Sequence, residues 1–216
     1  MSYKIIYHGS DVIVKNPTYH YENSNEHNDY GLGFYCTKNL DMAKEWANRK
    51  TREGFANKYS FDDRGLRILD LTDKSKYNVL NWIAILVHNR ELPEEDRLEF
   101  DDSIAYLEKY YINTQEYDVI IGYRADDAYF RFPLDFIRGN ITLEQLEQSF
   151  ELGKLGVQYV LISQRAIDRL TYIESVLSDE KYVDRYFENV RFATKRYDLL
   201  SKEADGIRIL DIMKGK

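Results

Sequence analysis

Three short segments of the chain carry residue types that could do chemistry. They span residues 7–10, 29–37 and 157–163, and the second is followed by a helical pattern that holds a tryptophan. His8 supplies an imidazole, Gln158 supplies an amide within an apolar strand, and glycines permit close approach of the backbone to a ligand. This inventory suits a flat aromatic ligand that bears hydroxyl groups, although alone it names no ligand.

The order of these segments resembles the His-Tyr-Glu signature of diphtheria-toxin-like and poly(ADP-ribose)-polymerase-like ADP-ribosyltransferases. Four strings carry the resemblance: Tyr-His-Gly-Ser, Asp-x-Gly-x-Gly-Phe-Tyr-x-Thr, Ala-Lys-x-Trp-Ala and Tyr-Asp-Val-Ile-Ile-Gly-x-x-Ala-Asp-Asp. Together they are similar to an uncharacterised bacterial branch of this superfamily, whose members are thought to act as toxins, often beside a small antitoxin. The similarity covers residues 1–170, and the tail from about Thr171 has no counterpart.

The resemblance implies an α+β fold with a split antiparallel β-sheet core and flanking helices. Residues 1–170 would form this ADP-ribosyltransferase-like domain, and residues 171–216 a helical C-terminal extension that ends in a short strand. The resemblance further implies a mono-ADP-ribosyltransferase, a glycosyltransferase that uses NAD as a substrate to modify a macromolecule. An antitoxin protein is the implied partner, and the sequence leaves open whether the acceptor is a protein, a nucleic acid or a small molecule.

Individual roles follow from the same resemblance. His8 would bond the ribose next to the adenine, and Gly9 would hold the nicotinamide amide through its backbone. Tyr35 and Trp46 would lie against the nicotinamide ring, whereas Ala43 stands where relatives often carry a serine. Four further residues of these segments are expected to contact NAD: Ser10, Gly33, Phe34 and Thr37.

Gln158 departs from the family pattern, because active members usually carry a catalytic glutamate there. An amide can orient a ribose hydroxyl, but it has no formal charge and cannot act as a base at neutral pH. The loss of one well-aimed electrostatic contact typically costs about 3–4 kcal/mol of transition-state stabilisation. Asp126 and Asp127, which lie near Arg124, are the candidates for a substitute carboxylate; the alternative is that they form a solvated turn.

Each of these residues also has a purely structural explanation. His8 could be a core histidine bonded to backbone, Trp46 could be a core residue of an amphipathic helix, and Gly31 and Gly33 could serve a turn. Cys36 is expected to be a small buried residue. A hydrolase that pairs Cys36 with His8 would lack a third group to orient the histidine.

Two other functions therefore compete with the transferase. The first is a catalytically weak or inactive module that binds NAD or a partner, which the glutamine at position 158 favours. The second is a structural or partner-binding protein, which rests on the 19 tyrosines and the charged helix expected at residues 178–202. The order of the motifs favours the transferase.

The hydrophobic pattern predicts short strands and helices in irregular order, which is typical of α+β proteins. Strands are expected at residues 4–7, 33–37, 59–61, 66–71, 117–122, 157–163 and 206–213. Helices are expected at residues 39–52, 76–90, from Asp101 or Asp102 to 111, 142–152, 165–170 and 178–202. Residues 65–70 and 206–211 nearly repeat each other, but six residues are too few to establish a duplication.

Composition limits the remaining classes. A net charge of −7 disfavours general binding of nucleic acid, since that needs a basic surface. No apolar run approaches the roughly 20 residues that span a bilayer, and no export signal is recognisable at the amino terminus. A single cysteine is compatible with a reducing compartment, so we expect a cytoplasmic protein that binds no membrane. The sequence also shows no cluster with metal-ligand spacing.

Overall fold

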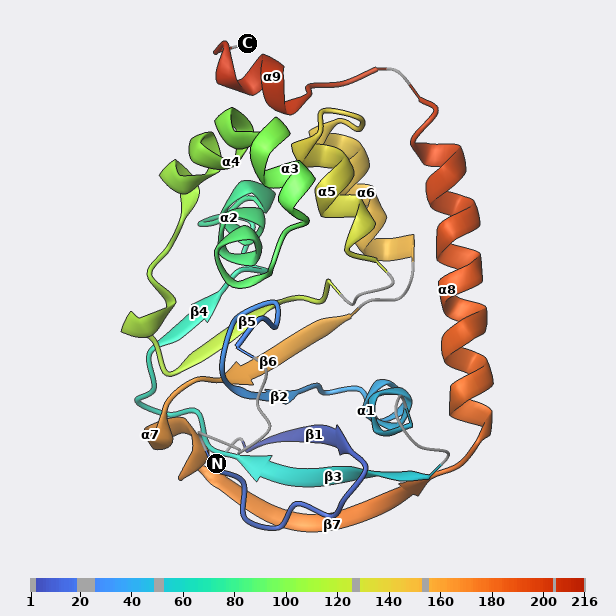
Figure 1. The fold of residues 1–216 in the computed structure, drawn as a ribbon. Helices are drawn as coiled ribbons and strands as arrows, with labels where there is room; N and C mark the ends of the chain where they lie inside the picture. The colour runs from blue at the N-terminus through green and yellow to red at the C-terminus, as the bar shows by residue number, and fades with distance from the viewer. Residues whose placement is uncertain are drawn as a thin grey trace.

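A computed structural model describes residues 3–18, 26–48, 53–125, 129–152, 156–203 and 205–215 of the chain. It has two sheets and a layer of helices (Figure 1). The helices α2 to α6 gather at one end, a three-stranded sheet forms the other end, and a four-stranded sheet lies between them. This arrangement confirms the α+β class expected from the sequence.

The three-stranded sheet is fully antiparallel and has the order β1-β3-β7. Its strands are β1 (Lys4–Ser10), β3 (Gly54–Phe61) and β7 (Leu170–Ser178). The sequence pattern did not predict β7. The expected domain boundary at residue 170 coincides with the first residue of this strand, so the first part of the expected C-terminal extension belongs to the sheet.

The four-stranded sheet has the order β2-β6-β5-β4. Its strands are β2 (Phe34–Cys36), β4 (Ile68–Asp70), β5 (Val119–Tyr123) and β6 (Val157–Leu161). β6 runs antiparallel to both of its neighbours, but β4 pairs with β5 in parallel. The sheet is therefore mixed, and in this respect it differs from the antiparallel core that the resemblance implied.

Local capping bonds set where several helices begin. The Asn39 side chain accepts hydrogen bonds from the backbone of Asp41 and Met42 and so caps α1 (Leu40–Ala47). Thr142 and Gln145 bond reciprocally at the start of α6 (Leu143–Leu152), as their spacing predicted. The cap expected from Asp101 or Asp102 was wrong, because α4 has Phe100 at this position without a side-chain cap.

The remaining elements complete the helical layer and the carboxyl-terminal part. They are α2 (Val79–Asn89), α3 (Glu94–Glu99), α4 (Asp101–Leu107), η1 (Glu108–Tyr110), η2 (Thr114–Glu116), α5 (Arg131–Ile137), α7 (Gln164–Ile167), α8 (Lys181–Leu200) and α9 (Ile209–Met213). The strand expected at residues 206–213 was wrong, since the structure forms α9 there. None of the helices within the described ranges is long and apolar enough to cross a membrane.

Among the described residues, two apolar cores hold these layers together. One lies within the helical layer and includes Trp82, Phe136 and Tyr197, together with Val160 from β6. The other joins the two sheets, because it contains Ile6 and Tyr59 from one sheet and residues of β2, β5 and β6 from the other. Alternate residues of β6 thus belong to different cores, which fixes the register of this strand.

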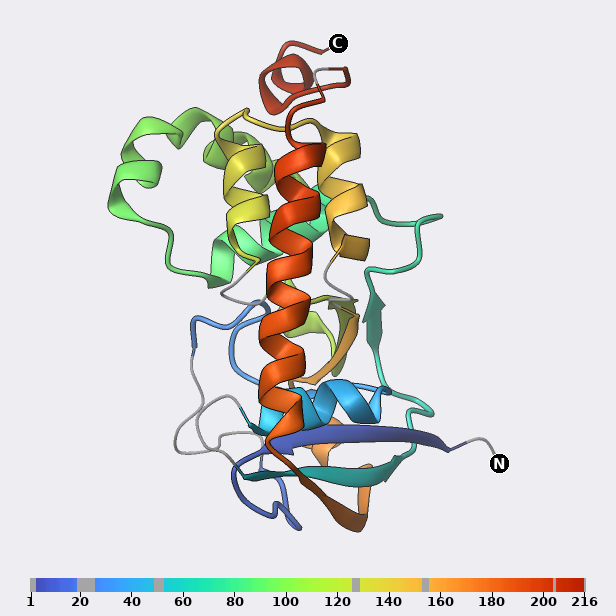
Figure 2. The same cartoon turned by 90° about the vertical axis from the view of Figure 1, so that its right-hand side faces the viewer.

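Helix α8 runs along the molecule from the three-stranded sheet to the helical layer (Figure 2). Near its start, Tyr182 and Arg185 bond Asp41 of α1. Near its end, Tyr197 is completely buried and its hydroxyl donates to Asp135 of α5 over 2.9 Å. The helix expected at residues 178–202 is confirmed over Lys181–Leu200, whereas Ser178 ends β7, and the helix connects both ends of the fold.

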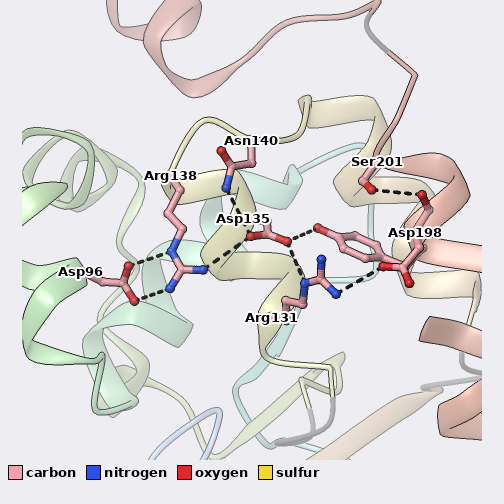
Figure 3. A network of polar contacts seen from close by, with 8 residues as sticks. Asp96, Arg131, Asp135, Arg138, Asn140, Asp198 and Ser201 are labelled. Carbon is pink, nitrogen blue, oxygen red and sulfur yellow. Dashed lines mark hydrogen bonds and ion pairs between the residues drawn. The ribbon is translucent and has the colours of Figure 1, made fainter. Parts of the chain in front are cut away.

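Asp135 is the centre of the polar network that fixes α5 (Figure 3). Besides the Tyr197 hydroxyl, its carboxylate contacts Arg131 Nε at 3.2 Å and Arg138 Nη1 at 3.5 Å. Arg138 also forms a two-pronged ion pair with the buried Asp96, with distances of 2.7 and 2.8 Å. The network therefore ties α3, α5 and α8 to one another.

Candidate functional site

The first two sequence segments meet where β1 touches β2. The backbone N–H of Tyr7 donates to the carbonyl of Thr37 over 2.7 Å, and the reverse bond measures 2.9 Å. This single bridge places the His8 ring against β2, where Nδ1 lies 2.7 Å from the carbonyl oxygen of Tyr35. The imidazole also stacks on the Phe34 ring with centroids 4.2 Å apart.

The contacts of His8 define its protonation state. A carbonyl oxygen only accepts, so Nδ1 must carry the proton. Burial lowers the pKa of His8 from 6.5, and the bond to the Tyr35 carbonyl opposes this shift without reversing it. At neutral pH the ring is therefore uncharged, and Nε2 presents a lone pair. Within the described residues Nε2 has no hydrogen-bond partner, so it is available to a ligand hydroxyl.

We expect His8 to titrate below pH 6.5 in the folded protein. Because the unfolded chain then binds a proton more readily than the folded one, the contribution of His8 to folding stability is complete above pH 6.5 and declines as the pH falls through the folded pKa. An NMR titration of the imidazole checks the midpoint, and urea unfolding at acid and neutral pH checks the stability. His8→Gln should lose this part of the pH dependence; a midpoint above 6.5 would contradict the assignment.

The Tyr35 side chain forms hydrogen bonds with the backbone of the loop that precedes β2. Its hydroxyl donates to the Gly31 carbonyl over 2.6 Å and accepts from the Tyr30 backbone N–H over 3.1 Å. Gly31 has a φ of +72°, a conformation that strongly favours glycine. Burial raises the pKa of Tyr35 well above its usual value. The phenol therefore stays protonated and serves as a positioned ring, not as a base.

Gln158 comes from the third segment and lies in the same neighbourhood. β6 pairs with β2 through Val160 opposite Tyr35, and with β5 through Gln158 opposite Gly122. The Gln158 side chain is buried, and its Nε2 donates to Asp29 Oδ2 over 2.9 Å. The structure thus brings the glutamine against the segment that carries Tyr35.

Asp29 is a site residue for which the sequence interpretation gave no role. The same Oδ2 accepts from the Ala125 backbone N–H over 2.8 Å, and Arg90 Nη1 lies 3.6 Å from Oδ1. Burial raises the pKa of Asp29 above its usual value, and the Ala125 bond, the charges of Arg90 and Arg124 and the bond from Gln158 oppose this shift without reversing it. Its place as the first residue of the Asp-x-Gly-x-Gly-Phe-Tyr string was the signal that could have identified it.

Trp46 reaches the site from α1. The guanidinium of the buried Arg124 lies 5.2 Å from the centre of the indole ring, which links α1 to the end of β5. The indole Nε1 is buried and has no hydrogen-bond partner among the described residues. A buried donor without an acceptor is unfavourable unless a ligand supplies one. Asp126 and Asp127, the predicted substitute carboxylates, fall outside the described ranges.

Gly9 packs against α1. A Cβ at this position would lie 2.7 Å from the Cβ of Trp46 and 2.9 Å from the backbone nitrogen of Ala47, and it would also strike the Ala43 carbonyl oxygen. Packing alone therefore requires glycine here. The expected backbone contact between Gly9 and a nicotinamide amide remains a prediction.

The other expected NAD contacts have structural roles of their own. Phe34 is part of the core between the sheets. The buried Thr37 accepts from the Asn39 backbone N–H over 3.1 Å, and a Cβ at Gly33 would meet Val160 at 2.7 Å. Ser10 bonds the Val12 backbone N–H over 3.3 Å in the turn after β1. These four residues shape the surroundings of His8 and Tyr35.

Cys36 is a poor candidate for a nucleophile. It is completely buried in the core between the sheets, and burial raises the pKa of its thiol well above the usual value. A hydrolase built on Cys36 and His8 would need an accessible thiolate. In the part of the chain that the structure describes, no group of three or more metal-ligating side chains is arranged to hold a metal ion.

Comparison with known proteins places the chain in a family. No curated protein and no solved structure matches it. A family model described as "Protein of unknown function (DUF3990)" matches residues 4–172. That range begins at the first residue of β1, ends within β7 and contains all the site residues named above. Since the match covers well over half of the sequence, the chain belongs to the DUF3990 family.

Proposed function

We propose that the protein is an NAD-dependent mono-ADP-ribosyltransferase, a toxin-type enzyme that modifies a macromolecule. The observation that carries the proposal is the convergence of the three segments. His8 bonds the backbone of Tyr35, Tyr35 stands beside β6, and Gln158 bonds the segment that leads to Tyr35. Three stretches that are far apart in the sequence thus supply groups to one region of the fold.

The chemistry of NAD cleavage suits these groups. Departure of nicotinamide leaves a positively charged, oxocarbenium-like sugar, comparable to that in glycoside hydrolysis. The neutral His8 would accept a hydrogen bond from a ribose hydroxyl through Nε2, and Tyr35 and Trp46 would flank the nicotinamide ring. Gln158 would direct its amide oxygen at the sugar. Fixed groups of this kind hold the substrate in a reactive conformation.

The indole N–H of Trp46, which has no acceptor within the part of the chain that the structure describes, further supports a ligand at this site. Its Nε1 is buried, and a bound molecule with an acceptor oxygen would supply the missing hydrogen-bond partner. Arg90 and Arg124 lie close enough to Asp29 to influence its pKa, and they place positive charge beside the same region. NAD carries amide and phosphate oxygens that fit both features. The residues present are therefore chemically compatible with NAD as the substrate.

The decisive experiment measures nicotinamide release and NAD-dependent labelling of lysate proteins by the pure protein. We expect both to fall about 100-fold in His8→Ala and Tyr35→Ala, the loss typical of a well-placed active-site group. Tyr3→Ala is the matched control, because Tyr3 is 51% exposed and lies outside the site. Labelling that stays at the wild-type level in both site variants would refute the assignment.

A second function, an NAD-binding module without turnover, is favoured by the glutamine at position 158. In that case NAD should raise the melting temperature while no nicotinamide appears. Release of nicotinamide by the pure wild-type protein would eliminate this alternative. The transferase proposal also includes a cytoplasmic location, an antitoxin partner and a protein or nucleic-acid acceptor. Labelling in cells tests the location and the acceptor, and co-purification tests the antitoxin partner.

A further inference from the structure

Asp29 and Gln158 form a buried pair whose geometry dictates how the glutamine is oriented. They are 6% and 4% exposed, and the Gln158 Nε2 donates to Asp29 Oδ2 over 2.9 Å. The same Oδ2 accepts from the Ala125 backbone N–H over 2.8 Å, so it acts as an acceptor and the amide must turn its NH₂ group towards it. Oε1 of Gln158 therefore points away from Asp29, and within the described residues it has no hydrogen-bond partner.

Two neighbouring groups favour the ionised form of the buried Asp29 carboxyl group and oppose the effect of its burial. The Ala125 backbone N–H donates to Oδ2 over 2.8 Å, and the Arg90 guanidinium lies 3.6 Å from Oδ1. Burying an ion without such partners is strongly unfavourable. The charged and titratable groups that face Asp29 come from its own segment, from the residue after α2 and from the residue after β5: Tyr30, Tyr35, Arg90 and Arg124.

We propose that Asp29 is a positioning residue that turns the amide oxygen of Gln158 towards the reacting sugar, and that the pair together supplies the negative charge which a single glutamate would otherwise supply. This inference rests on the proposed transferase function. The hydrogen bond from the amide to a carboxylate polarises the amide and increases the negative charge on Oε1. The amide oxygen of Gln158 is thus the acceptor that faces the developing cation. The formal negative charge is on Asp29, which bonds the opposite end of the amide group.

The pair makes an unusual prediction for Gln158→Glu. That change alone would set two carboxylates within hydrogen-bond distance of each other, and one of them would have to hold a proton. We therefore expect no gain in activity at pH 7, and a pH profile shifted upward relative to the wild type. The double variant Asp29→Asn with Gln158→Glu restores one amide and one carboxylate in exchanged positions, so its kcat should exceed the wild-type value.

Asp29→Asn alone should lower kcat about 10- to 100-fold and leave KM for NAD nearly unchanged. Without the carboxylate, Gln158 can present its NH₂ group to the developing cation, which is unfavourable. The matched control is Asp168→Asn, because Gln164 Nε2 donates to Asp168 over 2.8 Å in an equivalent pair on the exposed surface of α7. This control should behave as the wild type does.

The measurements are nicotinamide release as a function of NAD concentration and pH, together with NAD binding by calorimetry. A fall of kcat in Asp29→Asn and a gain in the double variant over Gln158→Glu support the pair. If the wild type turns over NAD but Asp29→Asn keeps its full kcat, or the double variant does no better than Gln158→Glu, the pair is refuted while the function stands. No NAD binding and no release by the wild type would overturn both.

Discussion

Asp135→Ala is expected to lower the free energy of unfolding by about 1–3 kcal/mol, the usual cost of leaving a buried hydroxyl without its acceptor. Asp135 is 7% exposed and forms ion pairs with Arg131 and Arg138. It also accepts a hydrogen bond from the hydroxyl of Tyr197, which is completely buried. Truncation leaves that hydroxyl without an acceptor and both guanidinium groups with one carboxylate fewer. For a chain of this size the melting temperature should fall by about 2–12 °C.

Asp198→Ala is the control for this prediction. Its carboxylate also pairs with Arg131, at 3.3 Å, but its side chain is 50% exposed. Exposed ion pairs contribute at most about 1 kcal/mol. Hydrogen exchange should show faster exchange in the carboxyl-terminal half of α8 in Asp135→Ala and not in Asp198→Ala. Equal losses of stability in the two variants would contradict a buried network that fastens α8.

The class of fold and most elements could be predicted from the sequence, because amphipathic periodicity and capping are local signals. Strand β7 could not be predicted in this way, because its pairing with β3 shifts register between Lys58 and Tyr59. In β7, Glu174 pairs with Lys58 and Tyr172 with Tyr59, so Ile173 is an extra residue and is 45% exposed. The bulge interrupts the alternation by which a strand is recognised.

The two similar hexapeptides show how tertiary context overrides local sequence. Residues 65–70 and 206–211 differ at one position, yet Ile68–Asp70 forms β4 whereas the second copy enters α9. β4 pairs in parallel with β5 inside a sheet. α9 instead packs on α4, where the Tyr106 hydroxyl donates to the Ile212 carbonyl over 3.2 Å. Identical propensities therefore give a strand or a helix according to the neighbour available.

The candidate site was predictable only in part, for a related reason. The resemblance predicted His8, Tyr35 and Gln158 as site residues, and the β1–β2 bridge and the pairing of β2 with β6 connect the strands that carry them. The partner of Gln158 could not be deduced, because Asp29 lies 129 residues away in sequence. The carboxylates predicted from their proximity to Arg124 were Asp126 and Asp127, whereas the carboxylate that bonds the neighbouring Ala125 backbone is Asp29.

Gly9→Ala is expected to reduce NAD affinity at least tenfold and to lower the free energy of unfolding by about 1–3 kcal/mol, the usual cost of overpacking. The new methyl group would meet the backbone of α1 at Ala43 and Ala47, and backbone atoms cannot change rotamer to make room. α1 must therefore move away from β1, and Trp46 moves with it. Gly65→Ala provides the comparison. Because Gly65 has a φ of +75°, an alanine there should lower the free energy of unfolding by about 1 kcal/mol. The new Cβ would come no closer than 3.7 Å to another atom, so it would cause no overpacking.

Calorimetry with NAD and urea unfolding separate the two effects. Gly65→Ala should lose stability and keep its NAD affinity, because Gly65 lies in the turn between β3 and β4 and does not position α1. Gly9→Ala should lose both, since the glycine that allows α1 to approach β1 also determines where the indole ring stands. If Gly9→Ala binds NAD as tightly as the wild type does, Trp46 does not form part of the nicotinamide site, and the unsatisfied indole N–H requires another explanation.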